Sequence, residues 1–179
     1  MRSAQETQQL AAEILAEMRA LLHGRRIRIM EVCGTHTVAI FRAGLRQVLP
    51  EGIELVSGPG CPVCVTADDY IDAAIAYAGM EDVVITTFGD MLKVPGTDSS
   101  LAEAQAAGAD VRIVYSPLDA LTIAAENPAK QVVFLAVGFE TTAPTEAAAV
   151  LAAEQQGCGN FFLLSAQKLV PPVMRALLD

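Results

Sequence analysis

Long apolar runs are missing from this sequence of 179 residues. A helix that spans a bilayer needs about 20 consecutive apolar residues, whereas the longest apolar runs here, 132–139 and 161–165, have the length of β-strands. The first residues are polar and do not resemble the apolar core of a signal peptide. The sequence therefore predicts a cytoplasmic protein without a membrane segment.

Basic charge is scarce as well. Twelve Lys and Arg residues stand against 21 Asp and Glu residues, which gives a net charge of −9. No basic cluster is dense enough to follow a phosphate backbone, so a nucleic-acid partner is not expected. The sequence also contains neither common phosphate-binding motif, GxxxxGK[ST] or GxGxxG, and no nucleophile elbow.

Cysteines are few, and in a chain that looks cytoplasmic they argue against a disulfide-based fold. The four are Cys33, Cys61, Cys64 and Cys158. In a cytoplasmic chain, four cysteines favour metal or redox chemistry. Cys158, in QQGCGN, is interpreted as an ordinary small residue near a turn.

Short β-rich apolar runs alternate with segments of helical periodicity along the chain. This alternation predicts an α/β fold with parallel sheets flanked by helices. Ser99 or Ser100 is the expected cap of the helix that starts there. The expected strands are 27–32, 53–57, 82–87, 111–115, 132–137 and 160–164; the expected helices are 5–23, 36–48, 67–78, 99–107, 117–126, 142–155 and one from about 171.

Four polar or glycine-rich segments follow expected strands. They are CGTHT after the first strand, GPGCPVC after the second, FGDMLKVPG after the third and GFETTAP after the fifth. In open α/β sheets, ligands bind beyond the carboxyl ends of the strands. The order of the segments therefore predicts one shared site.

The CPVC segment holds Cys61 and Cys64 in front of an expected helix. Thr66 is a candidate N-cap, with Asp69 three residues later as an imperfect capping box. A cysteine near a helix N-terminus is favoured as a thiolate, the form that exchanges disulfides and binds metals. The alternative is that both cysteines are buried as small apolar residues, which suits the tight Gly-Pro turn less well.

CGTHT combines Cys33 at the end of a strand with His36 near the start of a helix. Gly34 between them allows a close approach to the backbone. The second histidine, His23, is interpreted as a solvated residue at a helix C-terminus. By spacing alone, Cys33, His36, Cys61 and Cys64 spell C-x₂-H…C-x₂-C, a candidate Cys₃His zinc site. A chain with a large apolar core has little need of a structural zinc.

GFETTAP carries Glu140, followed by Thr141 or Thr142 as a candidate helix cap and by Pro144 in the first turn. Free N–H groups there are suited to an anion or a polar ligand. A well-capped helix explains every residue of this segment except Glu140.

Taken together, these segments resemble the HypD family of nickel–iron hydrogenase maturation proteins. The resemblance rests on MEVCGTHTVAIFRAGLRQVLP, ELVSGPGCPVCVT, TTFGDMLKVPG, GFETTAPTEA and QKLVPPVMRALL, in this order from about residue 27 to the end. It implies a cytoplasmic scaffold on which the Fe(CN)₂(CO) fragment of the hydrogenase site is assembled, with the small chaperone HypC and the cyanide donor HypE as partners. It also implies Rossmann-like lobes that face a cleft.

The resemblance assigns roles residue by residue. Cys33 is the expected iron ligand, shared with a cysteine of HypC, and Cys61 and Cys64 are the expected redox pair beside the iron. Further candidate iron ligands are His36, Cys61 and Cys64. Glu140 is a further expected catalytic residue. The remaining expected residues bind the cofactor together with Cys33 and His36: Gly34, Thr35, Thr37, Thr141 and Thr142.

The sequence departs from the family pattern in three ways. Val38 follows CGTHT where a polar or larger residue is common, and Gln167 precedes KLVPP where histidine is common. The family is also about twice as long, and its C-terminal part carries cysteines for a four-iron four-sulfur cluster that this chain lacks, so we expect a fragment or a shortened relative. The lobes implied for this chain are 42–124, and 1–41 together with 125–179.

Three other functions remain open from the sequence. A thiol–disulfide oxidoreductase would use CPVC alone, a structural zinc protein would use all four Cys and His residues, and an interaction module would use the loops only for docking. The scaffold interpretation is preferred because it accounts for both CGTHT and CPVC.

Overall fold

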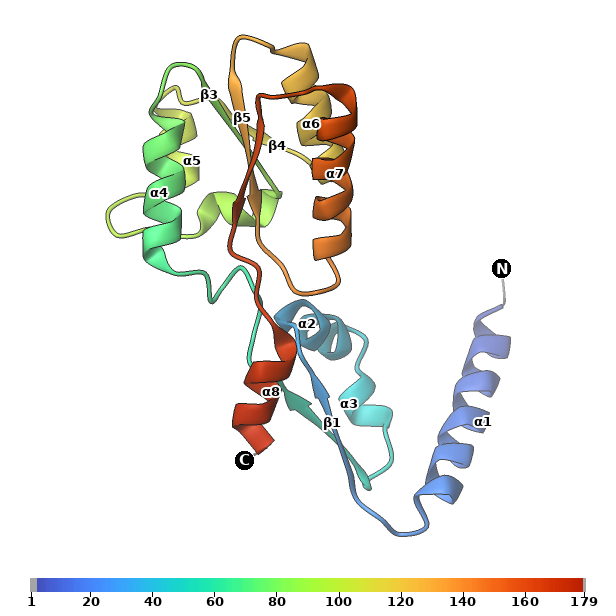
Figure 1. The fold of residues 1–179 in the computed structure, drawn as a ribbon. Coiled ribbons are helices and arrows are strands. Elements are labelled where there is room, and N and C mark those ends of the chain that lie inside the picture. Colours follow the sequence, from blue (N-terminus) through green and yellow to red (C-terminus); the bar gives the residue numbers. More distant parts are fainter. Residues whose placement is uncertain (1–2, 179) are drawn as a thin grey trace. The chain divides into compact units, whose positions relative to one another are not determined.

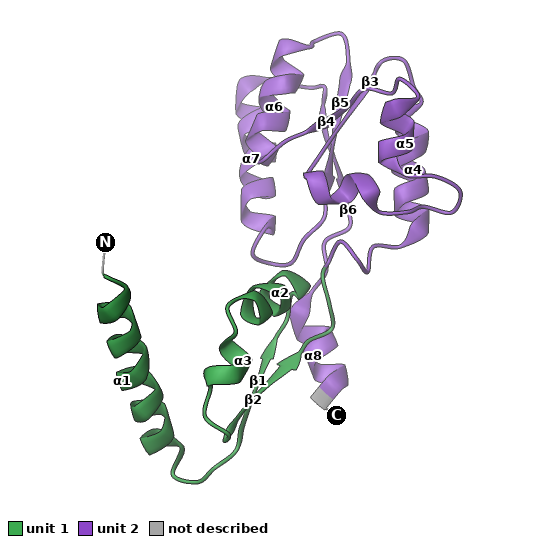
Figure 2. Cartoon of the chain, turned by 180° about the vertical axis from the view of Figure 1, so that it is seen from behind, with its two compact units in different colours: residues 1–61 green, residues 62–179 purple. Residues whose placement is uncertain are grey.

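A computed structural model of the chain describes residues 3–178. The chain divides into two compact units, Met1–Cys61 (unit 1) and Pro62–Asp179 (unit 2), as Figure 2 shows. Across the described residues, unit 1 has a two-stranded parallel sheet and unit 2 a four-stranded parallel sheet. The predicted α/β fold with parallel sheets is confirmed.

Unit 1 begins with a helix and continues as a β-α-β arrangement. Ser3 and Glu6 form a capping box that starts the first helix, and Gly24 follows its left-handed C-cap, His23. The two strands pair in parallel from Ile27 opposite Ile53 to Glu31 opposite Ser57. The elements are α1 (Ala4–Leu22), β1 (Ile27–Glu31), α2 (Gly34–Arg42), α3 (Leu45–Val48) and β2 (Ile53–Ser57).

The single helix predicted over 36–48 is wrong. Two helices, α2 and α3, replace it, because Gly44 adopts a left-handed conformation with φ of 63°. Helix α2 also begins earlier than predicted, at Gly34, so Cys33 is its N-cap.

Unit 2 is a doubly covered sheet with the strand order β4-β3-β5-β6. Helices α4 and α5 lie on one side of the sheet and α6 and α7 on the other (Figure 1). The elements are α4 (Asp68–Ala78), β3 (Val83–Thr87), the 3₁₀ helix η1 (Gly89–Lys93), α5 (Leu101–Ala106), β4 (Val111–Ile113), α6 (Pro117–Glu126), β5 (Gln131–Ala136), α7 (Ala143–Gln156), β6 (Phe161–Ser165) and α8 (Val170–Leu178).

Most of the buried side chains belong to unit 2. All five residues of β3 are buried, and Val132 and Phe134 of β5 are completely so. Burial on both faces is typical of central strands in a parallel sheet. Ser100 caps α5 in a capping box with Glu103, as predicted.

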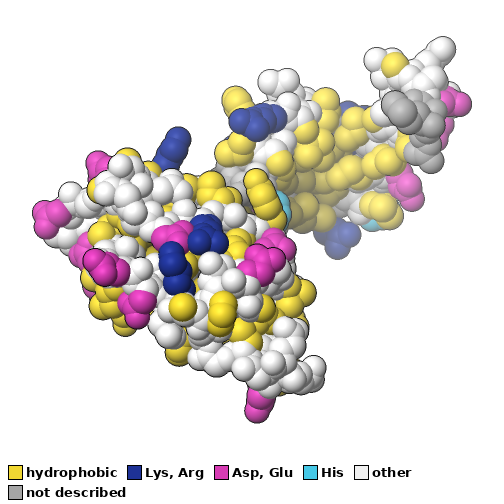
Figure 3. Space-filling view, turned by 90° about the horizontal axis from the view of Figure 1, so that it is seen from above, with side chains coloured by type: hydrophobic (Ala, Val, Ile, Leu, Met, Phe, Trp, Pro, Cys, Tyr) yellow, Lys and Arg dark blue, Asp and Glu magenta, His cyan; other side chains and the backbone are white. Residues whose placement is uncertain are grey.

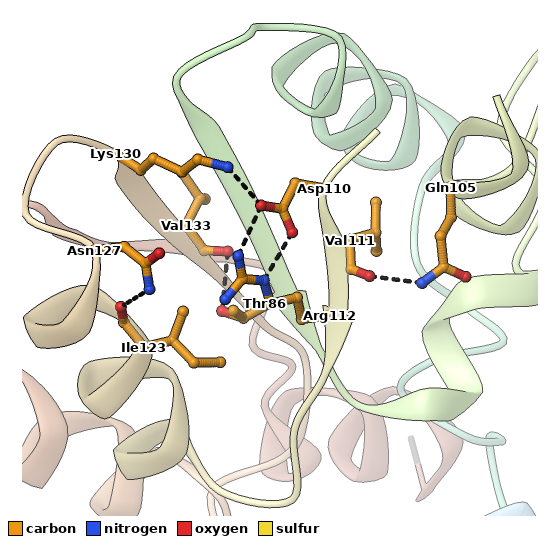
Figure 4. A network of polar contacts seen from close by, with 9 residues as sticks. All are labelled: Thr86, Gln105, Asp110, Val111, Arg112, Ile123, Asn127, Lys130 and Val133. Atoms are coloured by element: carbon orange, nitrogen blue, oxygen red, sulfur yellow. Dashed lines mark hydrogen bonds and ion pairs between the residues drawn. The ribbon is translucent and has the colours of Figure 1, made fainter. Parts of the chain in front are cut away.

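A polar network ties β4 to the turn before β5 at the amino ends of the strands. Asp110 accepts hydrogen bonds from Arg112 at 2.7 and 2.8 Å and from Lys130 at 2.7 Å (Figure 4). The bonds from Arg112 are the main cause that lowers the pKa of Asp110 to about 2. The network fixes one end of the sheet, away from the carboxyl ends.

The surface has mixed charge. On the face drawn in Figure 3, Lys and Arg side chains form small groups among acidic and apolar side chains. Among residues 3–178, no helix has both the length and the apolar character needed to cross a membrane. The lobe boundaries implied by the resemblance, 41/42 and 124/125, differ from the division into compact units and stay a prediction.

Candidate functional site

CGTHT lies where β1 ends and α2 begins, in unit 1. Cys33 is the N-cap of α2, and its carbonyl accepts the backbone N–H groups of His36 at 2.9 Å and Thr37 at 3.4 Å. The first backbone N–H groups of a helix lack partners within the helix and favour negative charge nearby. Cys33 is half-buried and lies directly before the first turn of α2, where its side chain makes no capping hydrogen bond.

The segment that follows β2 brings Cys61 to the same end of the unit 1 sheet. Gly58 donates its N–H to the Glu31 carbonyl at 2.7 Å, which extends the contact between the two chain segments beyond the last strand pair. A Cβ at Gly58 would collide with that carbonyl and lie 2.9 Å from the Cα of Val32. Only glycine fits there.

Gly34 and Cys61 meet as a result of this close approach. A Cβ built on Gly34 would lie 3.8 Å from the Cβ of Cys61. Gly60, with φ of 118°, gives the turn a conformation that other residues rarely adopt. The structure thus brings Cys61 beside the start of CGTHT at the end of the unit 1 sheet. FGDMLKVPG and GFETTAP follow β3 and β5 of the other sheet, so the single site expected for all four segments stays a prediction.

Glu31, the last residue of β1, is a buried carboxylate beneath this site. Its side chain accepts a hydrogen bond from the Thr37 hydroxyl at 3.2 Å, and Arg46 of α3 lies 3.7 Å from the same oxygen. The residue is only 8% exposed, and its second oxygen, Oε2, has no hydrogen-bond partner among residues 3–178. Glu31 was not among the expected site residues, because its burial depends on Thr37 and Arg46, which belong to other elements.

In unit 2, the CPVC turn is held by Thr66. Its hydroxyl donates to the Pro62 carbonyl at 2.9 Å, and its N–H donates to the Val63 carbonyl at 3.2 Å. The predicted N-cap role of Thr66 is wrong, because α4 begins at Asp68 after an Ala67 N-cap that provides no side-chain bond. Cys64 is exposed and lies before the Ala67 N-cap. It is therefore not part of the first turn of α4, where the sequence had placed it near a helix N-terminus.

Val63 of CPVC lies near the carboxyl ends of the unit 2 strands. Val63 packs against a cluster formed by Ile71, Met91 and Val137, which come from α4, η1 and the end of β5. Strand order reverses between β3 and β5, and ligands bind at such switch points. At the end of β3, the hydroxyl of the fully buried Thr87 has no partner among residues 3–178.

Glu140 caps the last helix instead of projecting alone into a site. Its carboxylate accepts the N–H of Val170, the first residue of α8, at 2.9 Å. Pro171 and Pro172 follow and have no N–H, so Val170 carries the only such donor in the first three positions of this helix. The expected catalytic role of the exposed Glu140 and the expected cofactor-binding roles of Thr141 and Thr142 stay predictions.

Thr142 belongs to a polar network behind GFETTAP. Its hydroxyl donates to the Phe139 carbonyl at 2.9 Å and accepts from the Gln167 amide at 3.1 Å, and the same amide donates to Glu146 at 2.6 Å. Burial raises the pKa of Glu146, which is 5% exposed, while the bond from Gln167 lowers it. This burial was not predictable from the sequence, because an acid in the first turn of a helix is usually solvated.

Tyr70 is linked to the same network by charge. Burial is the main cause that raises the pKa of Tyr70, and the negative charge of Glu146 adds to it. The Tyr70 hydroxyl donates to the Leu164 carbonyl at 2.6 Å, which joins α4 to β6. These contacts link α4 with β6 and with the first turn of α7.

A family model described as "HypD: Hydrogenase formation hypA family" matches residues 5–179. The chain belongs to the HypD family. Among its relatives, "Hydrogenase maturation factor HypD" of Rhodobacter capsulatus is 48% identical over 172 residues, which cover 95% of this chain and 46% of the relative. The protein of the same name from Escherichia coli (strain K12) is 50% identical over 155 residues, 87% of this chain and 42% of the relative.

A more distant HypD relative covers almost the whole chain. The protein named "Hydrogenase maturation factor HypD" in Cupriavidus necator is 42% identical over 179 residues, 99% of this chain and 46% of the relative. The chain therefore spans less than half the length of these curated HypD proteins.

The HypD motifs are divided between the two units. Cys33, His36 and Cys61 lie in unit 1, and Cys64 lies in unit 2. Within residues 3–178, no three His, Cys, Asp or Glu side chains form a group that would hold a metal ion. The Cys61–Cys64 redox pair and the metal roles of Cys33, His36, Cys61 and Cys64 stay predictions.

Cys158 is an ordinary half-buried residue, as predicted. Its sulfur lies 3.2 Å from the side-chain oxygen of Asn160, and it packs against a cluster that contains Val84 and Val132. This position, in unit 2 near the amino ends of β5 and β6, makes it a suitable control cysteine.

Proposed function

We propose that this chain carries the thiol site of a hydrogenase maturation factor, on which the Fe(CN)₂(CO) fragment of the nickel–iron site is assembled. Membership of the HypD family supports the general role, because relatives of up to 50% identity are named as hydrogenase maturation factors. The chain spans less than half of those relatives, so the activity of the whole protein is part of the proposal. The iron fragment is the cargo of this scaffold.

The observation that carries the proposal is the meeting of Gly34 and Cys61, with 3.8 Å between the two Cβ positions. This contact sets the first cysteine of CPVC beside the turn that carries Cys33. Cysteine sulfur is a soft donor that suits low-valent iron bearing CO and cyanide. Cys33 is the proposed iron ligand, because it is half-buried, lies directly before the first turn of α2 and adjoins Gly34, which meets Cys61.

Cys61 and Cys64 are the proposed redox pair. When the two thiols close to a disulfide, they release two electrons and two protons, and reduction of the disulfide takes them up again. The bound iron fragment is the proposed partner of this exchange. Gly34, Thr35, His36 and Thr37 would then surround the iron, with His36 as a further candidate ligand.

Two partners belong to the proposal. A small chaperone of the HypC type would supply a second cysteine to the iron, and a HypE-type protein would supply cyanide. A four-iron four-sulfur cluster is expected in the longer HypD proteins, and the four cysteines of this chain do not form a group that could hold one within residues 3–178. No step of the proposed chemistry on this chain depends on that cluster.

The test is metal analysis and infrared spectroscopy of the chain purified without oxygen together with its HypC-type partner. We expect iron with CO and cyanide stretching bands, lost in Cys33→Ala and retained in Cys158→Ala. Cys64→Ser should retain the bands but lose the thiol pair that titrates reversibly. Stoichiometric zinc without the bands would favour the Cys₃His site, and a titratable disulfide without metal would favour an oxidoreductase.

A further inference from the structure

The helix that carries CGTHT has few apolar anchors. In the described part of unit 1, residues 3–61, the buried residues are Leu22, Glu31 and Pro50. None of the residues described for α2 or α3 is buried. Burial of apolar side chains is the usual force that fixes a helix on a sheet, so another contact must fix the direction in which α2 presents Cys33.

Glu31 makes that contact. Its carboxylate accepts the Thr37 hydroxyl of α2 at 3.2 Å and lies 3.7 Å from Arg46 of α3, while its carbonyl accepts the Gly58 N–H at 2.7 Å. One buried residue thus connects β1 with both short helices and with the segment that leads to Cys61. Hydrogen bonds to a charged group are stronger than those between neutral groups.

Thr37 connects Glu31 with Cys33 through two hydrogen bonds. Its hydroxyl donates to Glu31, and its backbone N–H donates to the Cys33 carbonyl at 3.4 Å. The same carbonyl also accepts the N–H of His36. The position of Thr37 therefore determines the geometry of the turn from Cys33 to His36.

We propose that Glu31 is a positioning residue, which holds Thr37 and thereby orients the Cys33 thiol and His36 at the candidate site. Its buried Oε2 has no partner among residues 3–178, and an unpaired buried acceptor lowers stability. A purely stabilising role does not account for such an atom, whereas a positioning role requires only the bonds of Oε1. The expected effect of Glu31 on iron binding rests on the proposed function. Its expected effect on the geometry of the turn from Cys33 to His36 does not.

The test compares Thr37→Val, which has a similar shape but no hydroxyl, with Thr37→Ser, which keeps the hydroxyl. Two readouts are measured on the full chain: hydrogen exchange of the His36 and Thr37 amides, and the rate at which iodoacetamide alkylates Cys33. Loss of a hydrogen bond to a buried charged group should speed exchange of both amides by about tenfold in Thr37→Val. Alkylation of Cys33 should change as well, with Cys158 as the internal reference, and Thr37→Ser should restore both readouts.

Glu31→Gln is the second variant, because it keeps an acceptor oxygen but removes the charge. We expect an intermediate effect on both readouts. Glu54→Gln is the matched control, since Glu54 is an exposed carboxylate of β2 paired with Arg28 at 2.8 Å in the same sheet. It should leave the turn unchanged.

The proposal would be overturned if the His36 and Thr37 amides exchanged equally fast in Thr37→Val and in the parent chain. It would also be overturned if Thr37→Ser did not restore the exchange rates of the parent chain. Iron loading is then measured in the same variants. If the parent chain binds no iron, the proposed function fails while the exchange result still decides the role of Glu31. If Cys33→Ala abolishes loading and Thr37→Val does not affect it, Glu31 positions the turn without serving the iron.

Discussion

Replacement of Gly58 by alanine should separate the two chain segments that form the thiol site. A Cβ at this position would collide with the Glu31 carbonyl, and it would lie 2.9 Å from the Cα of Val32 and 3.2 Å from the carbonyl carbon of Glu31. All three atoms belong to the backbone. No side-chain rotation can relieve the overlap, so the segment after β2 must move away from β1.

The expected cost has two parts. Displacement breaks the bond from the Gly58 N–H to the Glu31 carbonyl, now 2.7 Å long, which contributes about 0.5–1.5 kcal/mol. Steric overpacking adds about 1–3 kcal/mol. Together these give about 1.5–4.5 kcal/mol for local opening, which corresponds to roughly tenfold or more in the exchange rate of an amide that the contact protects.

Hydrogen exchange at position 58, followed by mass spectrometry, measures this opening directly. Alkylation of Cys61 provides a second readout, because the movement also withdraws Cys61 from Gly34. Unit 2 amides, such as those of β3 and β5, should keep their exchange rates, since the variant does not touch their sheet.

Gly34→Ala is the matched control. Among the described residues, the nearest atom to its added Cβ is the Cβ of Cys61, at an ordinary contact distance of 3.8 Å. Alanine is also the better helix former at the start of α2. In this variant the exchange rate of the amide at position 58 should stay within about a factor of two of the rate in the parent chain. Equal exchange rates at position 58 in Gly58→Ala and Gly34→Ala would refute the predicted collision with the Glu31 carbonyl.

Two further predictions concern unit 2. The pKa of Asp110, lowered to about 2 mainly by Arg112, means that its bonds to Arg112 and Lys130 stabilise the fold above about pH 4 and are lost as the pH falls through about 2. The unfolding free energy of Asp110→Asn should therefore lie about 1 kcal/mol below the parent at neutral pH, allowing for solvent screening, and this difference should vanish near pH 2 in denaturant titrations. Glu140→Ala should speed exchange of the Val170 amide by about fivefold through loss of a cap worth about 1 kcal/mol, and Glu140→Gln should not; equal rates in both variants would contradict the capping role.

The order and type of most elements could be predicted from local patterns. The six strands and the large helices lie close to their predicted places, because buried parallel strands leave continuous apolar runs and helices leave a 3.6-residue period. Errors occurred where one residue adopts an unusual conformation or makes a different hydrogen bond from the one expected. Gly44 divides a predicted helix by its left-handed backbone, and Thr66 bonds to Pro62 instead of capping α4.

The candidate site could be predicted only in part. CGTHT and CPVC were recognisable from the sequence, and the sheet edge was inferred because parallel strands end together. The burial of Glu31 and Glu146 was not predictable, because each depends on partners from other elements: Thr37 and Arg46 for the first, Gln167 for the second. Glu140 was noticed, but its bond to Val170 spans thirty positions of the chain and has no local pattern.

The sequence by itself determined the chemistry that is available: four cysteines, two histidines and glycines at the strand ends, in an α/β chain of the HypD family. Only the tertiary structure decided which of these groups meet. Parallel pairing of β1 with β2 sets Cys61 against Gly34, and Gly58 allows the close contact that this requires. The physical reason is that secondary structure depends mainly on neighbours in sequence, whereas a site depends on distances between segments, which packing and buried hydrogen bonds fix.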